Sequence, residues 1–162
     1  MVSAAQRTRM VEIATFLIAH APQIHYAEVR PMSTARLTLP ELQTRFRTGG
    51  TITMDCSEAV TLICRLAGLR DPNGLGYNGE GYTGTLLDHL PHYTDVARGH
   101  PGALLVFGAG TGTHVCMVLE RDGENPILFS HGSEIGPLRI SLADERTAHE
   151  GEPITMLDIT HL

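Results

Sequence analysis

The sequence predicts an α+β fold in which helices come first in the chain and an antiparallel sheet follows. In the N-terminal part, apolar side chains recur at the spacing of amphipathic helices. After residue 101 the apolar runs are short, as in buried strands, and turn residues separate them. We therefore expect N-terminal helices packed on a C-terminal antiparallel β-sheet. A length of 162 residues fits one domain, residues 1–162, with a core of its own.

The individual elements follow from the apolar spacing and from the glycines and prolines between them. Helices are expected over residues 4–21, 39–46, 56–67 and 83–90, and extended segments over 24–26, 103–107, 113–119, 127–131 and 154–159. The dipeptide Asp122-Gly123 is typical of a tight hairpin turn. The glycine-rich passage 71–84 is too polar for a core element. It is interpreted either as a groove wall that approaches a ligand or as an ordinary surface loop.

The helix that begins at Cys56 is the element around which the chain is organised. Asp55 suits its N-cap, Glu58 stands three residues later as in a capping box, and Gly68 suits a left-handed C-terminal end. Cys56 then occupies the first helical position, where unpaired N–H groups and the helix dipole favour a thiolate. A thiolate at this place would be a nucleophile. The alternative is a cysteine that is simply buried, as free cysteines often are.

The predicted hairpin brings two histidines together. If Asp122 and Gly123 form a two-residue turn, His114 lies directly opposite His131 on the same face of the sheet. Together with Cys56, they match an arrangement of nucleophile, base and orienting group. His114 would take the thiol proton, and His131 would hold the His114 ring through its other nitrogen. Taken singly, each histidine is more simply explained as a partly buried side chain with an ordinary partner.

Charge and composition exclude several classes of function. The formal net charge of -6, without any basic run, argues against a nucleic-acid partner. No apolar run approaches the length of a membrane span, no signal peptide is evident, and no membrane partner is expected. Three cysteines do not make a disulfide framework, and the nine histidines lack the spacing of a metal motif. Neither a metal nor another cofactor is expected.

Several of these motifs together resemble the NlpC-like cell-wall cysteine peptidases, a compact branch of the papain-like fold. The matching segments are Asp55-Cys56-Ser57 before an apolar helix, the strand-like run 101–107, Thr113-His114-Val115, His131 in the place of the third polar residue, and Tyr26 in the place of a substrate-side tyrosine. The segments 30–32, 71–74 and 81–84 more narrowly resemble peptidase domains in endolysins of phages that infect mycobacteria and their relatives. Glu58, Ala103 and Cys116 depart from the usual glycine, aspartate and glycine of the family, which leaves the substrate preference open.

The resemblance implies a papain-like, NlpC-type fold and hydrolysis of an amide bond in the peptide of bacterial peptidoglycan. The residues that it implies are Cys56, His114 and His131 for catalysis, and Tyr26, Asp55 and Ser57 for binding the peptide. Such a phage lysis enzyme would remain in the host cytoplasm until a holin-type partner releases it to the wall, or it would belong to the virion tail. A wall-binding domain would be supplied separately. The alternatives are an N-acetylmuramoyl-L-alanine amidase, and a catalytically inactive domain that binds wall peptides or serves as a structural phage protein.

Overall fold

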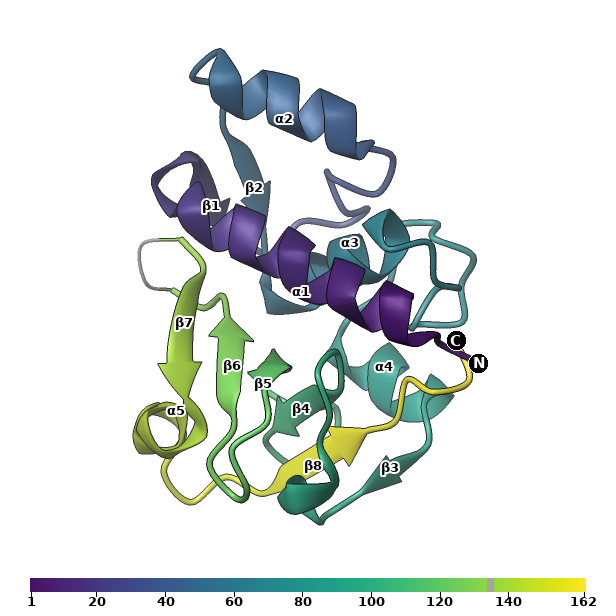
Figure 1. Cartoon of the computed structure of the whole chain (residues 1–162), viewed down its shortest axis with the longest axis vertical. Helices are drawn as coiled ribbons and strands as arrows, with labels where there is room; N and C mark the ends of the chain where they lie inside the picture. Colours follow the sequence, from purple (N-terminus) through teal and green to yellow (C-terminus); the bar gives the residue numbers. More distant parts are fainter. Residues whose placement is uncertain (134–135) are drawn as a thin grey trace.

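The computed structural model describes residues 1–133 and 136–162, and Figure 1 shows the order of their elements. The helices are α1 (Ala4–Ala19), α2 (Leu39–Arg47), α3 (Cys56–Leu66), α4 (Thr83–His89) and α5 (Leu142–Ala148), with short 3-10 turns η1 (Ala21–Gln23) and η2 (Val96–Arg98). The strands are β1 (Ile24–Tyr26), β2 (Ile52–Met54), β3 (His92–Tyr93), β4 (Leu104–Phe107), β5 (His114–Glu120), β6 (Ile127–Ser130), β7 (Leu138–Ser141) and β8 (Ile154–Leu157).

Strands β3 to β8 form one sheet in the order β3-β8-β4-β5-β6-β7, and each of these pairings is antiparallel. β1 and β2 form a separate parallel pair that leads into α3. The predicted α+β fold, with helices first and an antiparallel sheet second, is confirmed. Among the residues that the structure describes, no helix is both long and apolar enough to cross a bilayer.

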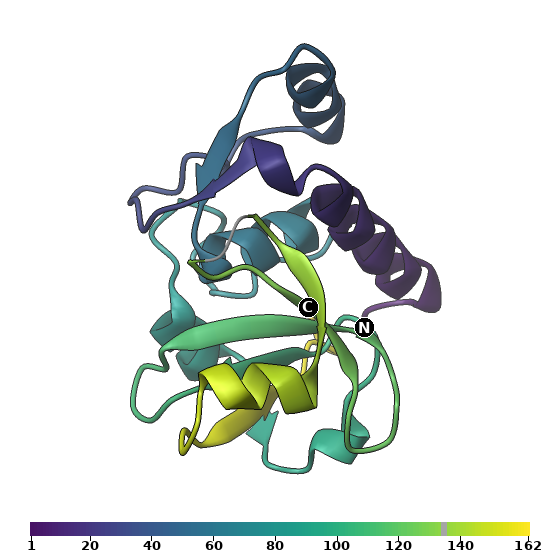
Figure 2. The same cartoon turned by 90° about the vertical axis from the view of Figure 1, so that its left-hand side faces the viewer.

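Helices cover both faces of the sheet, so its central strands lie in the core. α1 and α3 lie over one face and α5 over the other (Figure 1 and Figure 2). β4 is buried along its whole length, which explains its unbroken apolar run. Leu104 of β4 packs in the cluster that contains Val60 of α3, whereas Leu105 packs in the cluster that contains Leu142 of α5. The strand thus contributes alternate side chains to two apolar layers.

The two ends of α3 are formed as the sequence predicts, with one exception. The Asp55 carboxylate accepts a hydrogen bond of 2.7 Å from the Glu58 N–H, and Gly68 adopts a positive φ of 75° directly after the C-cap. The predicted capping box is wrong, because the Glu58 side chain does not return to the N-cap. Its carboxylate instead accepts hydrogen bonds of 2.7 Å from both the N–H and the hydroxyl of Thr34. Glu58 therefore links helix α3 to the loop that precedes α2.

Several elements lie outside the sequence prediction. α1 ends at Ala19, and Pro22 lies in the 3-10 turn that follows instead of directly closing the helix. β2, β3, β7 and α5 were not expected, since each is short and none presents a long apolar pattern. Ser141 nevertheless caps α5 by accepting a hydrogen bond from the Asp144 N–H, and Ser-x-x-Asp is a recognisable signal for a helix start. That signal was available in the sequence.

The predicted register of the hairpin between β5 and β6 is wrong by one residue. Met117 faces Phe129 and Val118 faces Leu128, and the register shifts again between Val118 and Glu120. The turn is also wider than two residues, because the Asn125 N–H donates to the Asp122 carbonyl over 2.8 Å. A shift of one residue moves a side chain to the opposite face of the sheet. His114 and His131 are therefore not cross-strand partners.

Glu58 gives the stability of the protein a defined pH dependence. Burial, reinforced by Asp55 and opposed by the Thr34 hydrogen bonds, raises the pKa of the Glu58 carboxyl above its ordinary value. The folded protein binds this proton more tightly than the unfolded chain does. The resulting stabilisation is fully present below about pH 4 and is lost as the pH rises through the raised pKa.

We expect Glu58→Gln to remove this loss of folding stability with rising pH. The free energy of unfolding, measured by urea denaturation between about pH 4 and pH 8, should fall with pH more steeply in the wild type than in the variant. Glu150→Gln, at an exposed acidic position, is the control and should follow the wild type. Parallel curves for wild type and Glu58→Gln would contradict the assignment.

Candidate active site

Cys56 is held at the start of α3 by the elements on both sides of it. β2 brings the chain to the helix, and Asp55 caps the first turn. The Cys56 side chain is 5% exposed, so it is mostly enclosed without being sealed from solvent. The first turn of a helix directs backbone N–H groups without intrahelical partners toward such a side chain. The predicted position of Cys56 at the helix N-terminus is confirmed.

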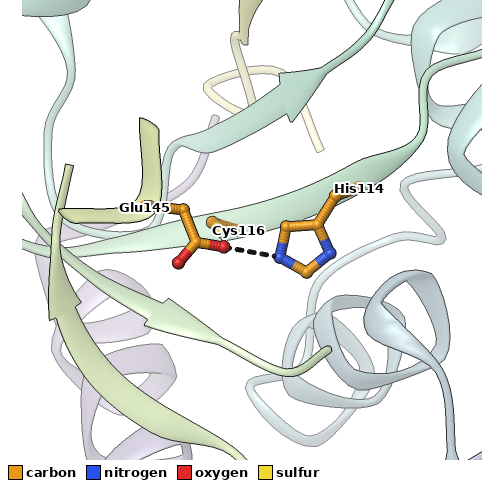
Figure 3. A group of neighbouring side chains, drawn as sticks. All are labelled: His114, Cys116 and Glu145. Carbon is orange, nitrogen blue, oxygen red and sulfur yellow. Dashed lines mark hydrogen bonds and ion pairs between the residues drawn. The ribbon is translucent and has the colours of Figure 1, made fainter. Parts of the chain in front are cut away.

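His114 begins β5, and its ring is fixed from one side. Its Nε2 lies 3.0 Å from the Ser130 hydroxyl oxygen and 3.0 Å from Glu145 Oε1, and Figure 3 shows the contact with Glu145. The Ser130 hydroxyl donates to the same Glu145 oxygen over 2.9 Å. An ionised carboxylate only accepts hydrogen bonds, so Nε2 must carry a proton. Nδ1 is then the ring nitrogen that is left to accept a proton.

The Cys56 thiol lies close enough to the His114 imidazole to influence the pKa of the ring. Burial by itself lowers the pKa of His114, but the neighbouring Cys116, Cys56 and Glu145 side chains raise it well above the ordinary value for histidine. The site therefore favours an imidazolium at His114. An imidazolium next to a thiol is the arrangement that stabilises a thiolate nucleophile.

Glu145 is the carboxylate that contacts the His114 ring, and the sequence pattern does not predict this contact. The residue comes from α5, and its side chain is only 7% exposed. Burial alone raises the pKa of a carboxyl group, but hydrogen bonds from His114, Ser130 and Cys116 bring the pKa of Glu145 below its usual value. Glu145 is thus a buried carboxylate that stays ionised and holds the His114 ring.

His131 has a different position from the one predicted for it. Its Nε2 lies 3.0 Å from the Met54 carbonyl, at the end of β2, and its side chain is fully buried. A carbonyl can only accept, so His131 donates to it through Nε2. The Tyr26 ring meets the His131 ring edge-on, with centroids 5.5 Å apart. His131 therefore supports the backbone that precedes Cys56, whereas the His114 Nε2 contacts Ser130 and Glu145.

Asp55 and Ser57 form a hydrogen-bonded network with Arg30 beside the nucleophile. Arg30 Nη2 lies 2.8 Å from Asp55 Oδ2 and 2.8 Å from the Ser57 hydroxyl, which donates to Asp55 Oδ1 over 2.8 Å. Arg30 also donates to the Gly81 carbonyl, which links the glycine-rich passage to this network. Asp55 and Ser57 are both buried, so their observed role is to order the start of α3. Their predicted role in binding a peptide stays a prediction.

A pocket with a volume of about 460 Å³ opens beside His114, and its wall also includes Tyr26, Glu145 and His149. Burial is the main cause that raises the pKa of the Tyr26 hydroxyl to about 12, and the nearby Cys56 and Asp55 add to it. Tyr26 therefore stays a neutral hydroxyl at the edge of the pocket. This is a position from which it could contact a bound substrate.

The other two cysteines are unsuited to nucleophilic attack. Burial raises the pKa of the Cys64 thiol to about 12. Burial likewise raises the pKa of the Cys116 thiol, although His114 opposes the shift. Both side chains are fully buried, whereas Cys56 retains some exposure. Cys56 is accordingly the thiol that combines access, a helix N-terminus and a histidine partner.

Comparison of the chain with protein-family models and with curated protein sequences finds no match. The resemblance to the NlpC-like peptidases therefore rests on the motif residues of the sequence. The geometry of Cys56, His114 and Glu145 stands independently of that resemblance.

We expect Glu145→Gln to slow alkylation of Cys56 by iodoacetamide at neutral pH by roughly tenfold or more. A hydrogen bond to a charged group contributes about 1.5–3 kcal/mol, and the variant removes the charge that stabilises the His114 imidazolium. Mass mapping of the labelled peptide measures the rate at Cys56 alone. Glu150→Gln is the matched control on an exposed carboxylate, and an equal rate in both variants would contradict the role of Glu145.

We expect His131→Ala to act mainly on stability. The change leaves the buried Met54 carbonyl without its 3.0 Å donor, although the Ala27 N–H still lies 3.4 Å from it. The loss in unfolding free energy, measured by urea denaturation, should be about 1–3 kcal/mol. His131→Gln retains a hydrogen-bond donor and should therefore lose less unfolding free energy than His131→Ala. Slowing of Cys56 alkylation to the level of Glu145→Gln would return His131 to the orienting role.

Proposed function

We propose that this protein is a cysteine peptidase of the NlpC-like, papain-like type that hydrolyses an amide bond in the peptide of bacterial peptidoglycan. The observation that carries the proposal is that Glu145 lies 3.0 Å from Nε2 of the His114 ring, while Cys56 at the start of α3 lies close enough to influence the pKa of that ring. A nucleophile, a base and a group that orients the base are the three parts that thiol hydrolysis requires. The choice of peptidoglycan as substrate rests on the motif resemblance.

The reaction begins with proton transfer within the Cys56–His114 pair. Nδ1 of His114 takes the thiol proton while Glu145 holds Nε2–H, so the ring has the tautomer that a base at Nδ1 requires. The thiolate attacks the amide carbonyl carbon and forms a tetrahedral oxyanion. The Cys56 backbone N–H is available to stabilise that oxyanion, because the first residue of a helix has no intrahelical acceptor.

In the breakdown of the tetrahedral intermediate, the same histidine acts as a general acid. His114 returns its proton to the leaving amine as the carbon–nitrogen bond breaks, which leaves a thioester on Cys56. Water, deprotonated by His114, then attacks the thioester and releases the carboxylic acid and the free thiol. Glu145 stabilises the imidazolium in both halves of the cycle. It accepts hydrogen bonds throughout and is not itself required to take up a proton.

The peptide would lie along the pocket that Tyr26, His114 and His149 line. A phage lysis enzyme that a holin-type partner releases to the wall, or a tail-associated enzyme, remains the proposed setting. Digestion of purified peptidoglycan followed by mass spectrometry of the fragments tests the function directly. New amino and carboxyl ends within the stem or the cross-bridge would support a peptidase. Release of intact stem peptides from muramic acid would instead identify an amidase. If no fragment is released, the result would indicate a catalytically inactive binding domain.

We expect Cys56→Ala to be folded and inactive on peptidoglycan, because it removes the nucleophile. Cys64→Ala is the matched control, since it removes a thiol of the same helix that is fully buried. His114→Ala should lose at least the roughly 10²–10⁴-fold that general acid–base catalysis supplies. Turbidity of a cell-wall suspension measures the rates, and circular dichroism checks the fold. Full activity in Cys56→Ala would refute the proposal.

A further inference from the structure

Three side chains of types that bind metal ions converge at the start of β5, and the proposed catalytic base is one of them. His114, Cys116 and Glu145 each offer a ligand atom, and these atoms all lie within 4.8 Å of one another (Figure 3). His114 Nε2 is 3.0 Å from Glu145 Oε1, and Cys116 Sγ is 3.6 Å from the same oxygen. Alternation along β5 directs His114 and Cys116 to the same face of the sheet, and α5 places Glu145 over them.

The two contacts of Glu145 match two edges of a tetrahedral zinc site. With Zn–N and Zn–O bonds of about 2.0–2.2 Å and a Zn–S bond of about 2.3 Å, tetrahedral geometry separates nitrogen from oxygen by about 3.4 Å and sulfur from oxygen by about 3.6 Å. The observed separations of 3.0 Å and 3.6 Å require a movement of only a few tenths of an ångström. The two donors that contact Glu145 are therefore near the separations that a bound ion requires, and the remaining pair, His114 and Cys116, lies within 4.8 Å.

The chemistry of the donors favours zinc in particular. An imidazole, a thiolate and a carboxylate are the three ligand types that Zn²⁺ accepts. A thiolate and a carboxylate together would balance the two positive charges of the ion in this buried place. Three protein ligands leave a fourth position open, and His149 Nε2, 3.8 Å from Glu145 Oε1, is a further nitrogen donor nearby. His114, Glu145 and His149 line the pocket of about 460 Å³ through which an ion would enter.

We propose that His114, Cys116 and Glu145 form a zinc-binding site, and that occupation of this site switches the catalytic centre off. The bound ion would coordinate Nε2 of His114, the carboxylate of Glu145 and the Cys116 thiolate, and the protons on Nε2 and on the Cys116 thiol would both pass to the solvent. A cation would then stand where the reaction needs a carboxylate, so a positive imidazolium could no longer form beside the Cys56 thiolate. The inhibition rests on the proposed peptidase function, whereas the binding of zinc does not.

Cobalt, a spectroscopic substitute for zinc, tests the site without any substrate. The metal-free protein is titrated with Co²⁺ in a reducing buffer that contains no thiol. A thiolate-to-cobalt charge-transfer band in the near ultraviolet should appear with one equivalent in the wild type and in Cys56→Ala. The band should disappear on addition of Zn²⁺. It should be absent in Cys116→Ala and present in Cys64→Ala, the control at the other fully buried cysteine.

A second measurement keeps the test decisive if Cys116→Ala folds poorly. Zn²⁺ should raise the melting temperature of the wild type, because a ligand that binds only the folded state stabilises it. Glu145→Gln should weaken zinc binding by more than the roughly 10–100-fold that loss of an outer group costs. A band that is lost in Cys56→Ala and kept in Cys116→Ala would overturn the site. So would the absence of stoichiometric binding to the wild type.

Activity separates this inference from the proposed function. Zn²⁺ should slow wall hydrolysis by the wild type at least tenfold, and a chelator should restore the rate. A protein that binds cobalt through Cys116, but never cleaves peptidoglycan without metal, would support the zinc site and refute the peptidase. A metal-free protein that cleaves peptidoglycan and is insensitive to zinc would refute the inhibition and leave the peptidase intact.

Discussion

The site depends on one packing constraint, which is that the N-terminal end of α3 meets the end of the sheet at which β5 begins. The apolar face of α3 and the inner side chains of β5 belong to one buried cluster that includes Val60 and Val115. Each such side chain contributes about 1.5–3 kcal/mol when it is fully buried. Cys56 begins the helix and His114 begins the strand, so the burial that docks the elements also brings the two side chains near each other.

A second layer on the other face of the sheet completes the arrangement. α5 docks through Leu142, and this docking places Glu145 against His114. A buried carboxylate is costly unless donors surround it, and Glu145 accepts from His114, Ser130 and Cys116. The same convergence that fixes the histidine tautomer also assembles the donors of a metal site. One carboxylate thus connects the proposed chemistry with its proposed inhibition.

The error in the predicted pairing of His131 with His114 has a definite physical cause. An ideal two-residue turn at Asp122-Gly123 would have placed His131 across from His114. The actual turn is wider and offsets the register by two residues at Glu120 and Ile127, and the irregularity between Val118 and Glu120 then reduces the offset to one residue. Because side chains alternate between faces, this difference exchanges the residues that can reach the histidine. His131 instead donates to the Met54 carbonyl before Cys56, and Glu145 contacts Nε2 of His114.

The sequence by itself determined the features that depend on a few neighbouring residues. The Asp55 N-cap, the place of Cys56 at the helix start, the ending at Gly68 and the apolar run of β4 could all be predicted, because capping and local burial patterns act over one or two turns. Only the tertiary structure decided that Glu145 would hold His114. That contact joins two distant segments, and it depends on how a short helix docks on a sheet whose register no local pattern specifies.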